Sequence, residues 1–343
     1  MSRSRALQTY VVARLLLIPL MLWTVTTVVF LLLRATPGDV VDAILGPKAP
    51  AAQKIAMRSQ LGLDQPLWRQ YADYMGDLLH FDLGTSFTSQ GETVWKIIHD
   101  FFPATVELTL FSMIVAMIIG ISAGILSASR PNTIFDLGGR LFGIITYALP
   151  MFWVGMLLKL VFAVQLGWFP DGTRFPVRML SLRPQGPTGL YTLDSLLSGN
   201  IQAFGITLHH LALPSLTLGV VLSGIFERIV RVNLQQTLQA DYVEAARARG
   251  IPERRILVIH ALRNALIPVI TVLGLTFAAM LGGAVLTEVT FSWPGLGNRL
   301  YIAISDRDYA TVQGIIIFVS VIIVLASIII DIVNAYVDPR IRY

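Results

Sequence analysis

The residues whose types and spacing point most clearly to an interaction site lie in a polar, arginine-rich stretch between two long apolar runs. Residues 242–249 are mostly strong helix formers, and Glu244 stands early among them, where the helix dipole favours an anion. Gly250 can take the left-handed backbone that ends a helix, and Pro252 suits the first turn of the next one. The pattern predicts two short helices joined by an elbow, and the chemistry it offers is non-covalent docking.

The surface expected on this elbow is small and basic. Ala245 and Ala246 carry little side chain, so another surface can approach them closely, and Tyr242 opens the first helix. The rim is basic, formed by Arg247, Arg249, Arg254 and Arg255. A second interpretation stays open, in which this is an ordinary amphipathic loop whose arginines only set membrane topology.

Motifs for covalent chemistry are missing from the sequence. It has no GxxxxGK[ST] phosphate loop and no HExxH metal motif. It also has no cysteine, which rules out disulfides and thiolate metal sites. We therefore expect no catalytic residue, no metal site and no bound cofactor, and the chain itself should not be an enzyme.

The elements that position the elbow are membrane spans. Of 343 residues, 55% are hydrophobic and only 14% are charged, which indicates an all-α polytopic membrane protein rather than a soluble domain. Apolar runs of about 20 residues predict six transmembrane helices. They are 15–33, 108–128, 141–166, 211–226, 265–286 and 314–333, the fourth being the shortest.

The distribution of charge predicts the orientation. With both termini and the loops 129–140 and 227–264 on one side, that side carries 14 arginines against seven acidic residues. The positive-inside rule then places the termini and the elbow in the cytoplasm. The first apolar run lacks a small-residue cleavage site, so it should remain as an anchor helix. The pI of about 9.6 therefore reflects topology, and no nucleic-acid partner is expected.

Two outer segments are large. Within 35–100, proline-initiated helices are predicted over 50–61 and 66–79, with another short helix over 92–99. The second outer segment, 167–210, is rich in proline and should be irregular. Near the third, Trp293 precedes Pro294 and Gly295, which predicts a tight turn with the indole at the membrane interface.

Several polar or bend-forming residues within the spans are candidates for a translocation pathway. Pro150 should bend the third span, with Tyr147 and Trp153 around it, and Lys159 follows near the outer side. Packing against lipid or protein explains the aromatic residues equally well, and Lys159 can instead extend to the interface. Glu107 is expected at the outer interface. Among the remaining polar and small residues, we expect Glu227 to pair with a nearby arginine, and the repeat of Gly120 and Gly124 to serve close helix packing.

Short motifs along nearly the whole chain resemble the first permease subunit of the dipeptide, oligopeptide and nickel importer family of ABC transporters. The elbow carries the Glu-Ala-Ala…Gly pattern of that family's cytoplasmic coupling loop. One departure is that His260 to Arg263 stand where the general pattern has Ile-x-Leu-Pro, and the proline comes later, as Pro268. The other motifs are at 36–39, 61–66, 76–78, 82–86, 260–268, 291–297, 307–309 and 338–342.

The resemblance implies a type I ABC importer permease fold in a bacterial inner membrane. It implies a cytoplasmic N-terminus and first helix over 1–34, an outer helical segment over 35–100, a permease core over 101–334 with its coupling loop at 236–262, and a cytoplasmic tail over 335–343. The implied partners are a second homologous permease subunit, two ATPase subunits that use ATP and Mg²⁺, and an extracytoplasmic solute-binding protein.

Other functions remain open at this point. An ion-coupled secondary transporter or a channel subunit is the main alternative, although paired acids within spans and an internal repeat are not evident. An intramembrane enzyme would need a nucleophile and base. The resemblance favours import of di- or oligopeptides, but it leaves glutathione, nickel chelates and other solutes possible.

Overall fold

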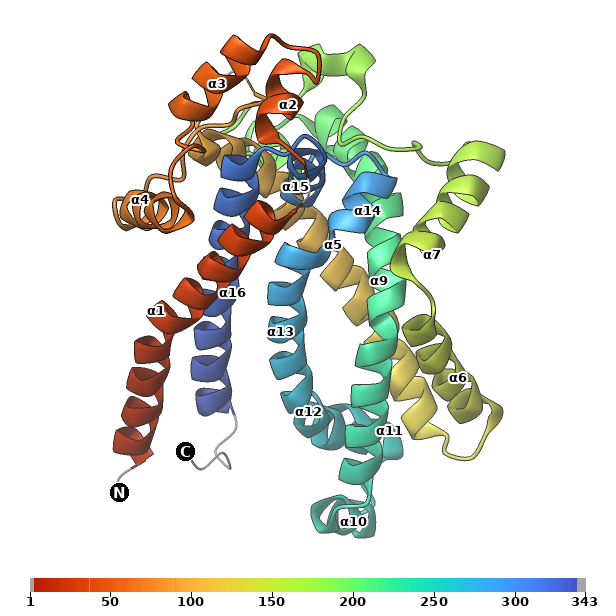
Figure 1. Ribbon diagram of the computed structural model, residues 1–343. Coiled ribbons are helices and arrows are strands. Elements are labelled where there is room, and N and C mark those ends of the chain that lie inside the picture. The colour runs from red at the N-terminus through yellow and green to blue at the C-terminus, as the bar shows by residue number, and fades with distance from the viewer. Residues whose placement is uncertain (1–2, 37, 90, 338–343) are drawn as a thin grey trace.

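The computed structural model describes residues 3–36, 38–89 and 91–337. Throughout this described part the regular structure is helical, apart from one antiparallel bridge between Thr85 and Thr93. Figure 1 shows the long helices running roughly in one direction, with short helices at both ends of the bundle. The prediction of an all-α protein is therefore confirmed.

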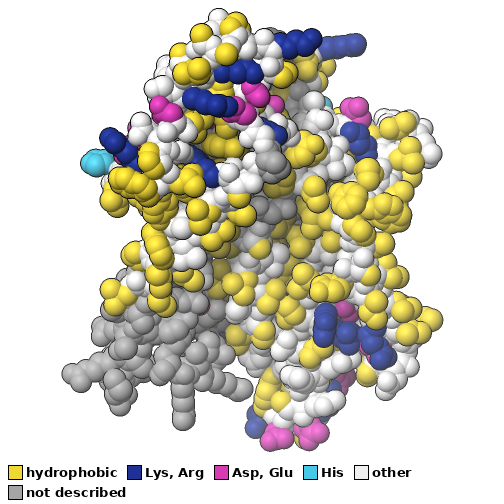
Figure 2. All heavy atoms as spheres, viewed as in Figure 1, with side chains coloured by type: hydrophobic (Ala, Val, Ile, Leu, Met, Phe, Trp, Pro, Cys, Tyr) yellow, Lys and Arg dark blue, Asp and Glu magenta, His cyan; other side chains and the backbone are white. Residues whose placement is uncertain are grey.

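In the described part of the chain, four helices are long and apolar enough to cross a membrane unaided. They are α1 (Arg3–Ala35), α5 (Val94–Ser129), α9 (Ile201–Leu238) and α16 (Tyr309–Val337). Apolar side chains cover much of the middle of the visible face, while charged groups gather towards its two ends (Figure 2). This arrangement is what a bilayer requires of spanning helices.

The two remaining spans are bent pairs of helices. In the first, α6 (Ile134–Ala148) meets α7 (Met151–Leu158) and η1 (Lys159–Gln165) at an angle of 101°. Pro150 explains the break, because proline disfavours helical backbone in the preceding residue, and Leu149 is extended with ψ 131°. The predicted bend at Pro150 is confirmed.

The second bent pair joins residues 253–265 to α13 (Ile267–Gly283) at 48°. Pro268 stands in the first turn of α13, where its missing N–H costs nothing, so it starts this helix. With each pair counted as one span, the chain reaches the six that the hydropathy predicted.

The fourth span is much longer than its apolar run over 211–226. It is the 38-residue helix α9, and Pro214 lies inside it without ending it. Polar residues on either side of the run, including His209 and Glu227, shortened the prediction, yet both have partners within the protein: His209 Nε2 lies 2.7 Å from the Trp168 carbonyl oxygen, and Glu227 pairs with Arg231 at 3.0 Å. Hydropathy counts such side chains as polar although the fold satisfies them.

The core lies where α5 and α9 pack along each other. A Cβ on Gly120 would stand 2.5 Å from the Ser223 carbonyl oxygen, and one on Gly124 2.7 Å from the Val230 Cβ. The two glycines thus allow the backbones to approach, as predicted. Apolar side chains fill the rest of the interface, including Leu108, Met113, Leu211, Leu218 and Phe226.

The outer segments hold more helix than predicted. The helices expected over 50–61 and 66–79 are α3 (Ala51–Gln60) and α4 (Leu67–Leu79), with Pro50 and Pro66 at their N-caps. The short helix expected over 92–99 was wrong as a separate element, because the helix that begins at Val94 continues into α5. The remaining short outer helices are α2 (Val40–Leu45), η2 (Val177–Leu182), α8 (Tyr191–Leu197), α14 (Val285–Thr290) and α15 (Leu296–Ser305). The segment 167–210 is therefore only partly irregular.

Candidate functional site

The predicted elbow is present at the end of the bundle opposite the short outer helices (Figure 1). After α9 ends at Leu238, the chain forms α10 (Asp241–Ala248) and then α11 (Glu253–Arg255), with Pro252 at the N-cap of α11. Gly250 lies between them with φ +72°, and its N–H donates to the Arg247 carbonyl (2.9 Å). An added Cβ would meet nothing within 4 Å, so glycine is needed here for its backbone conformation and not for space.

A small apolar cluster holds the elbow closed, and we call it the elbow core. It consists of Val243, Ala246 and Ile256, with Ile251 packed beside them. Val243 and Ile256 are fully buried. The two alanines therefore differ: Ala245 is exposed, whereas Ala246 is approached by this chain's own side chains.

The polar side chains of the elbow remain at its surface. Arg247 Nε donates to Glu253 Oε1 (2.7 Å), which bridges the two helices across Gly250. The Tyr242 hydroxyl accepts from Asn264 Nδ2 (2.9 Å), yet its side chain remains 45% exposed. Glu244 and Arg249 are exposed as well. The sequence candidates of this region thus form one accessible surface.

Beside the elbow is a polar cleft of about 830 Å³, bounded by the end of α5, the start of α6, α9 and α11. Three of its four arginines are in ion pairs: Arg140 with Asp136 (2.8 Å), Arg231 with Glu227 (3.0 Å), and Arg247 with Glu253. The expected pairing of Glu227 with a nearby arginine is observed, and its side chain is fully buried in α9.

The pathway candidates lie far from the elbow along the chain, around the bend between α6 and α7. Tyr147 is 85% exposed and Trp153 43% exposed, on either side of Pro150. Lys159 Nζ donates to the Thr290 carbonyl (3.1 Å) in the last turn of α14. The C-terminal end of a helix stabilises a cation, so the Thr290 carbonyl is a favourable partner for the Lys159 ammonium group.

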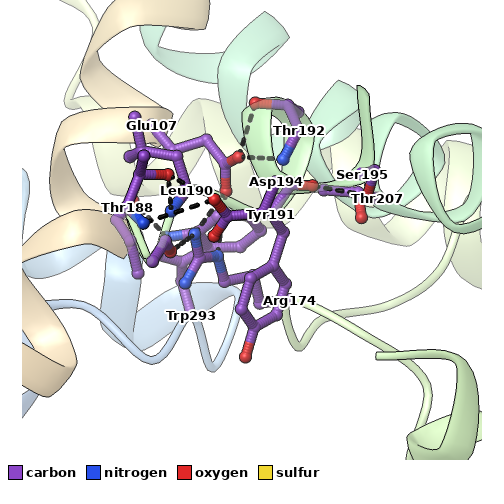
Figure 3. Close-up of polar contacts among 12 residues, drawn as sticks. Glu107, Arg174, Thr188, Leu190, Tyr191, Thr192, Asp194, Ser195, Thr207 and Trp293 are labelled. Atoms are coloured by element: carbon purple, nitrogen blue, oxygen red, sulfur yellow. Dashed lines mark hydrogen bonds and ion pairs between the residues drawn. The ribbon is translucent and has the colours of Figure 1, made fainter. Parts of the chain in front are cut away.

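A buried polar cluster at the outer end was not predicted from the sequence. Glu107 is 1% exposed and pairs with Arg174 at 2.7 Å, and its carboxylate also accepts from the N–H and hydroxyl of Thr192 (2.7 Å each). Figure 3 shows these side chains converging from α5 and the segment 174–194. The prediction that Glu107 lies at the interface was wrong, because this segment folds over it and supplies its donors.

A second buried carboxylate, Glu288, fixes the third outer loop. It accepts from Thr105 Oγ1 (2.6 Å) and from the Asn298 N–H (2.8 Å), and burial raises its pKa to about 7. Trp293 in the same loop is fully buried and donates to the Ala104 carbonyl (2.9 Å). The predicted interfacial position of Trp293 was therefore wrong, since its turn folds inwards against α5.

Within the described residues, no group of three or more histidine, aspartate or glutamate side chains is arranged to hold a metal ion. The polar clusters at the outer end link segments of the chain to one another. The elbow is the candidate site whose polar groups remain available to a partner.

Comparison with known families identifies the chain. Residues 117–343 match the model of the binding-protein-dependent transport system inner membrane component, and residues 7–109 match the N-terminal model of the same type of membrane component. The chain belongs to this family. Membership confirms the resemblance seen in the motifs and gives the helices the type I ABC importer permease fold.

Relatives align over almost the full length. The chain is 41% identical to the di/tripeptide transport system permease protein of Pseudomonas aeruginosa, covering 93% of this chain and 94% of the relative. It is 38% identical to the dipeptide transport system permease protein of Alkalihalophilus pseudofirmus, covering 97% and 99%. It is also 37% identical to the glutathione transport system permease protein of Escherichia coli, again covering 97% and 99%.

Several conclusions follow from this membership. The chain is a multi-pass inner-membrane permease, and the alternative of an ion-coupled transporter or channel is not favoured. Its relatives are transport subunits, not enzymes. A family member of this kind works with an ATPase, a binding protein and a second permease subunit.

Proposed function

We propose that this chain forms half of the translocation pathway of an ATP-driven importer for short peptides, and that the elbow of α10 and α11 is where an ATPase subunit docks. The observation that carries the docking proposal is the exposed elbow surface supported by its own buried core. The peptide substrate is supported by the names of the relatives, which include di/tripeptide, dipeptide and oligopeptide permeases.

The elbow belongs on the cytoplasmic side in this proposal. The first turns of α1, the last turns of α16 and the elbow lie at the same end of the bundle (Figure 1). The arginine excess of the segments at this end supports a cytoplasmic position for both termini under the positive-inside rule. ATP and Mg²⁺ would be handled by the docked subunits, since the chain has no phosphate-binding loop of its own.

The connections of the elbow suit it to transmit movement. On one side only residues 239–240 separate α10 from α9, which extends to the outer segments. On the other side, η3 (Ile256–Ala261) contributes Ile256 to the elbow core and leads through α12 (Leu262–Ala265) into α13. A displacement of α10 by the ATPase would therefore act on two spans at once.

The bend of the third span is the proposed position of pathway residues. Tyr147 and Trp153 expose aromatic surface on either side of Pro150, at a break where helical packing is interrupted. In a complex with a second permease subunit, this surface would face the shared pathway. Lys159, at the start of η1, would hold this part of the third span against α14 through the Thr290 carbonyl.

The docking proposal is tested with two elbow variants in the complex co-expressed from the neighbouring genes. Gly250→Pro forces φ to about −65° where +72° is observed and removes a hydrogen bond. Ala245→Trp places a large ring on the exposed face of α10 without entering the elbow core. Ala56→Trp, on exposed α3 among the outer helices, is the matched control.

We expect both elbow variants to lose labelled-dipeptide uptake and peptide-stimulated ATP hydrolysis in lipid vesicles by about tenfold or more, which is about 1.4 kcal/mol of coupling. The control should retain both activities. If Ala245→Trp couples normally, the elbow is not the docking site. If the wild-type complex hydrolyses ATP but neither takes up the labelled dipeptide nor hydrolyses faster with peptide, the proposed substrate is wrong and the docking proposal stands.

A further inference from the structure

A second cavity lies near the outer end of the bundle, between α4 and the first and last spans, α1 and α16. It has a volume of about 680 Å³, and the start of α5 and the chain between α4 and α5 complete its walls. All of its lining side chains are apolar or aromatic except that of Thr26. The walls include Leu22 and Trp23 of α1, Met75 and Leu79 of α4, and Phe318 and Val321 of α16.

One face of α4 packs on α1 just beyond this cavity. The hydroxyl groups of Tyr71 and Thr27 share a hydrogen bond (2.6 Å). The rings of Tyr71 and Tyr74 contact Phe30, at 5.2 and 5.7 Å between centroids. The α1 residues that line the cavity all precede Thr27, so they lie further from the outer end. Figure 1 shows α4 nearly along its axis, beside the outer part of α1, so α4 lies across the spans and forms the outer wall of the cavity.

The rest of the surface of α4 is divided between a charged face and an apolar one. The charged face carries an arginine and two aspartates, among them the exposed Asp73. The apolar face carries Trp68, Ala72, Met75 and Leu79, at spacings of three and four residues. Trp68 and Leu79 are 71% and 81% exposed, and Figure 2 shows hydrophobic side chains gathered at α4 on the side that faces the length of α1. A helix with a charged face and an exposed apolar face is typical of the interface between membrane and water.

Three of the six tryptophans of the chain stand around this cavity. Trp23 and Trp95 line it and are 53% and 45% exposed, and Trp68 lies on the apolar face of α4. Trp95 Nε1 donates to the Phe81 carbonyl (2.8 Å), so its polar atom has a partner while the ring stays exposed. Exposed tryptophans gather where acyl chains meet head groups, which places α4 at that level of the membrane.

The walls and the shape of the cavity select its occupant. A buried water needs about two to four polar partners, which walls that are apolar apart from Thr26 do not supply. A spanning helix of a second subunit would have to cross the whole hydrocarbon core of about 30 Å, and α4 blocks the outer end of this space. An acyl chain ends within the hydrocarbon core. It can enter from the side, because Trp23 and Leu79 in the walls are largely exposed.

We propose that this cavity holds an acyl chain of a phospholipid whose head group lies beside α4 in the outer leaflet. A helix at head-group level leaves a space in the hydrocarbon layer beneath it, and the chain of a neighbouring lipid fills that space. The bound chain would tie α4, and with it the segment that joins α1 to α5, to a fixed depth in the membrane. Neither the ATPase docking nor the peptide substrate proposed above enters here, because only the spans and α4 line the cavity together with the start of α5.

The occupant is identified by cross-linking in the co-expressed complex, reconstituted in vesicles of phosphatidylethanolamine and phosphatidylglycerol. A small share of the phosphatidylethanolamine carries a photoreactive diazirine in the middle of one acyl chain. After illumination we expect the lipid on Met75 and Phe318, which line the cavity and are only partly exposed. Val321→Trp and Leu22→Trp each fill the cavity from a different wall and should lower both cross-links by about tenfold or more.

Leu325→Trp is the matched control, because Leu325 is exposed one turn further along α16 and does not line the cavity. It should leave the cross-links at Met75 and Phe318 unchanged, and the melting temperature of each variant shows whether the fold is retained. Equal cross-linking in wild type and in both cavity variants would overturn the site, since lipids of the general bilayer would then explain it. If the lipid is found on Leu325 but on neither Met75 nor Phe318, a partner subunit fills the cavity and the proposal is wrong.

The position of α4 is measured separately on the full-length chain, which has no cysteine of its own. Ala72→Cys and Asp73→Cys place a spin label on the apolar and on the charged face of α4. In vesicles we expect the label at position 72 to collide mainly with oxygen, which concentrates in the hydrocarbon layer, and the label at position 73 mainly with a water-soluble nickel complex. Equal contact with the nickel complex at both positions would show that α4 stands clear of the membrane, and the proposal would fail.

Discussion

The polar clusters around Glu107 and Glu288 at the outer end keep their charged side chains inside the protein, whereas the elbow at the other end keeps its own on the surface. Glu107, Arg174 and Glu288 are at most 4% exposed. Arg247 and Glu253 form an ion pair of the same length as that of Glu107 and Arg174, yet their side chains are 41% and 66% exposed. The same interaction therefore serves two different purposes.

Burial decides what each ion pair contributes. A buried charge without its partner is strongly unfavourable, so the pair of Glu107 and Arg174 holds the two segments that carry it in one arrangement. An exposed pair contributes little, so the elbow depends on its small apolar core and can exchange its surface contacts for those of a partner. Substitutions at the outer end should thus affect stability, and substitutions on the elbow should affect coupling.

The largest effect is expected for Glu107→Leu, which leaves the Arg174 guanidinium buried without a carboxylate. We expect a loss of about 3–5 kcal/mol in unfolding free energy, seen as a large drop in melting temperature. Glu107→Leu combined with Arg174→Met should recover much of that loss, since no charge is then stranded. An unchanged melting temperature in the single variant would show that the outer end is not held by this pair.

The next effect concerns pH and Glu288, whose pKa is raised by burial from 4.5 to about 7. Between these values the folded state holds a proton that the unfolded state releases, so stability falls as pH rises, by up to about 1.4 kcal/mol per pH unit, and levels off above pH 7. Glu288→Gln should remove this dependence of stability on pH. It should also lower the stability by an amount that does not vary with pH, because one hydrogen-bond acceptor is lost. Melting curves from pH 5 to 8 measure it, and equal slopes in both proteins would contradict the prediction.

A smaller effect is expected for Val243→Ala in the elbow core, which removes buried methyl groups worth about 1–2 kcal/mol. The loss should be local: faster amide exchange across α10 and α11 with an unchanged global melting temperature. Val232→Ala, on the exposed side of α9, is the control. A lower global melting temperature would mean that the elbow unfolds together with the spans and that the two ends are not independent.

The smallest effect is expected for the exposed pair itself. Arg247→Ala and Glu253→Ala, alone and together, should give a coupling energy below about 1 kcal/mol in a double-mutant cycle for unfolding. A larger value would show that the ion pair, and not the apolar core, closes the elbow. In either case high salt should lower the coupling energy between Arg247 and Glu253, because salt screens exposed charges.

Local patterns explain why much of the fold could be predicted. Runs of apolar residues marked the spans, and Gly250 and Pro252 marked the elbow, because backbone preferences act within a few residues. Pro150 likewise predicted the bend of the third span, since proline restricts the residue before it. The family motifs added the coupling role, which stays a prediction for Tyr242, Glu244, Ala245, Arg247 and their neighbours.

The long-range partners could not be predicted. Glu107 and Arg174 are 67 residues apart in the chain, and Thr105 and Glu288, which share a hydrogen bond, are 183 residues apart. Nothing local indicated that Ala246 would face inwards while Ala245 faced outwards, since that depends on where Ile256 returns.

The sequence alone determined that this protein is a helical membrane permease with a glycine–proline elbow, because hydropathy, backbone preference and the family motifs are all carried by short stretches of chain. Only the tertiary structure decided which charges are buried and which face of the elbow is exposed. Those properties depend on desolvation, and the solvent exposure of a side chain is set by segments that lie far from it in the sequence, as Thr105 does from Glu288.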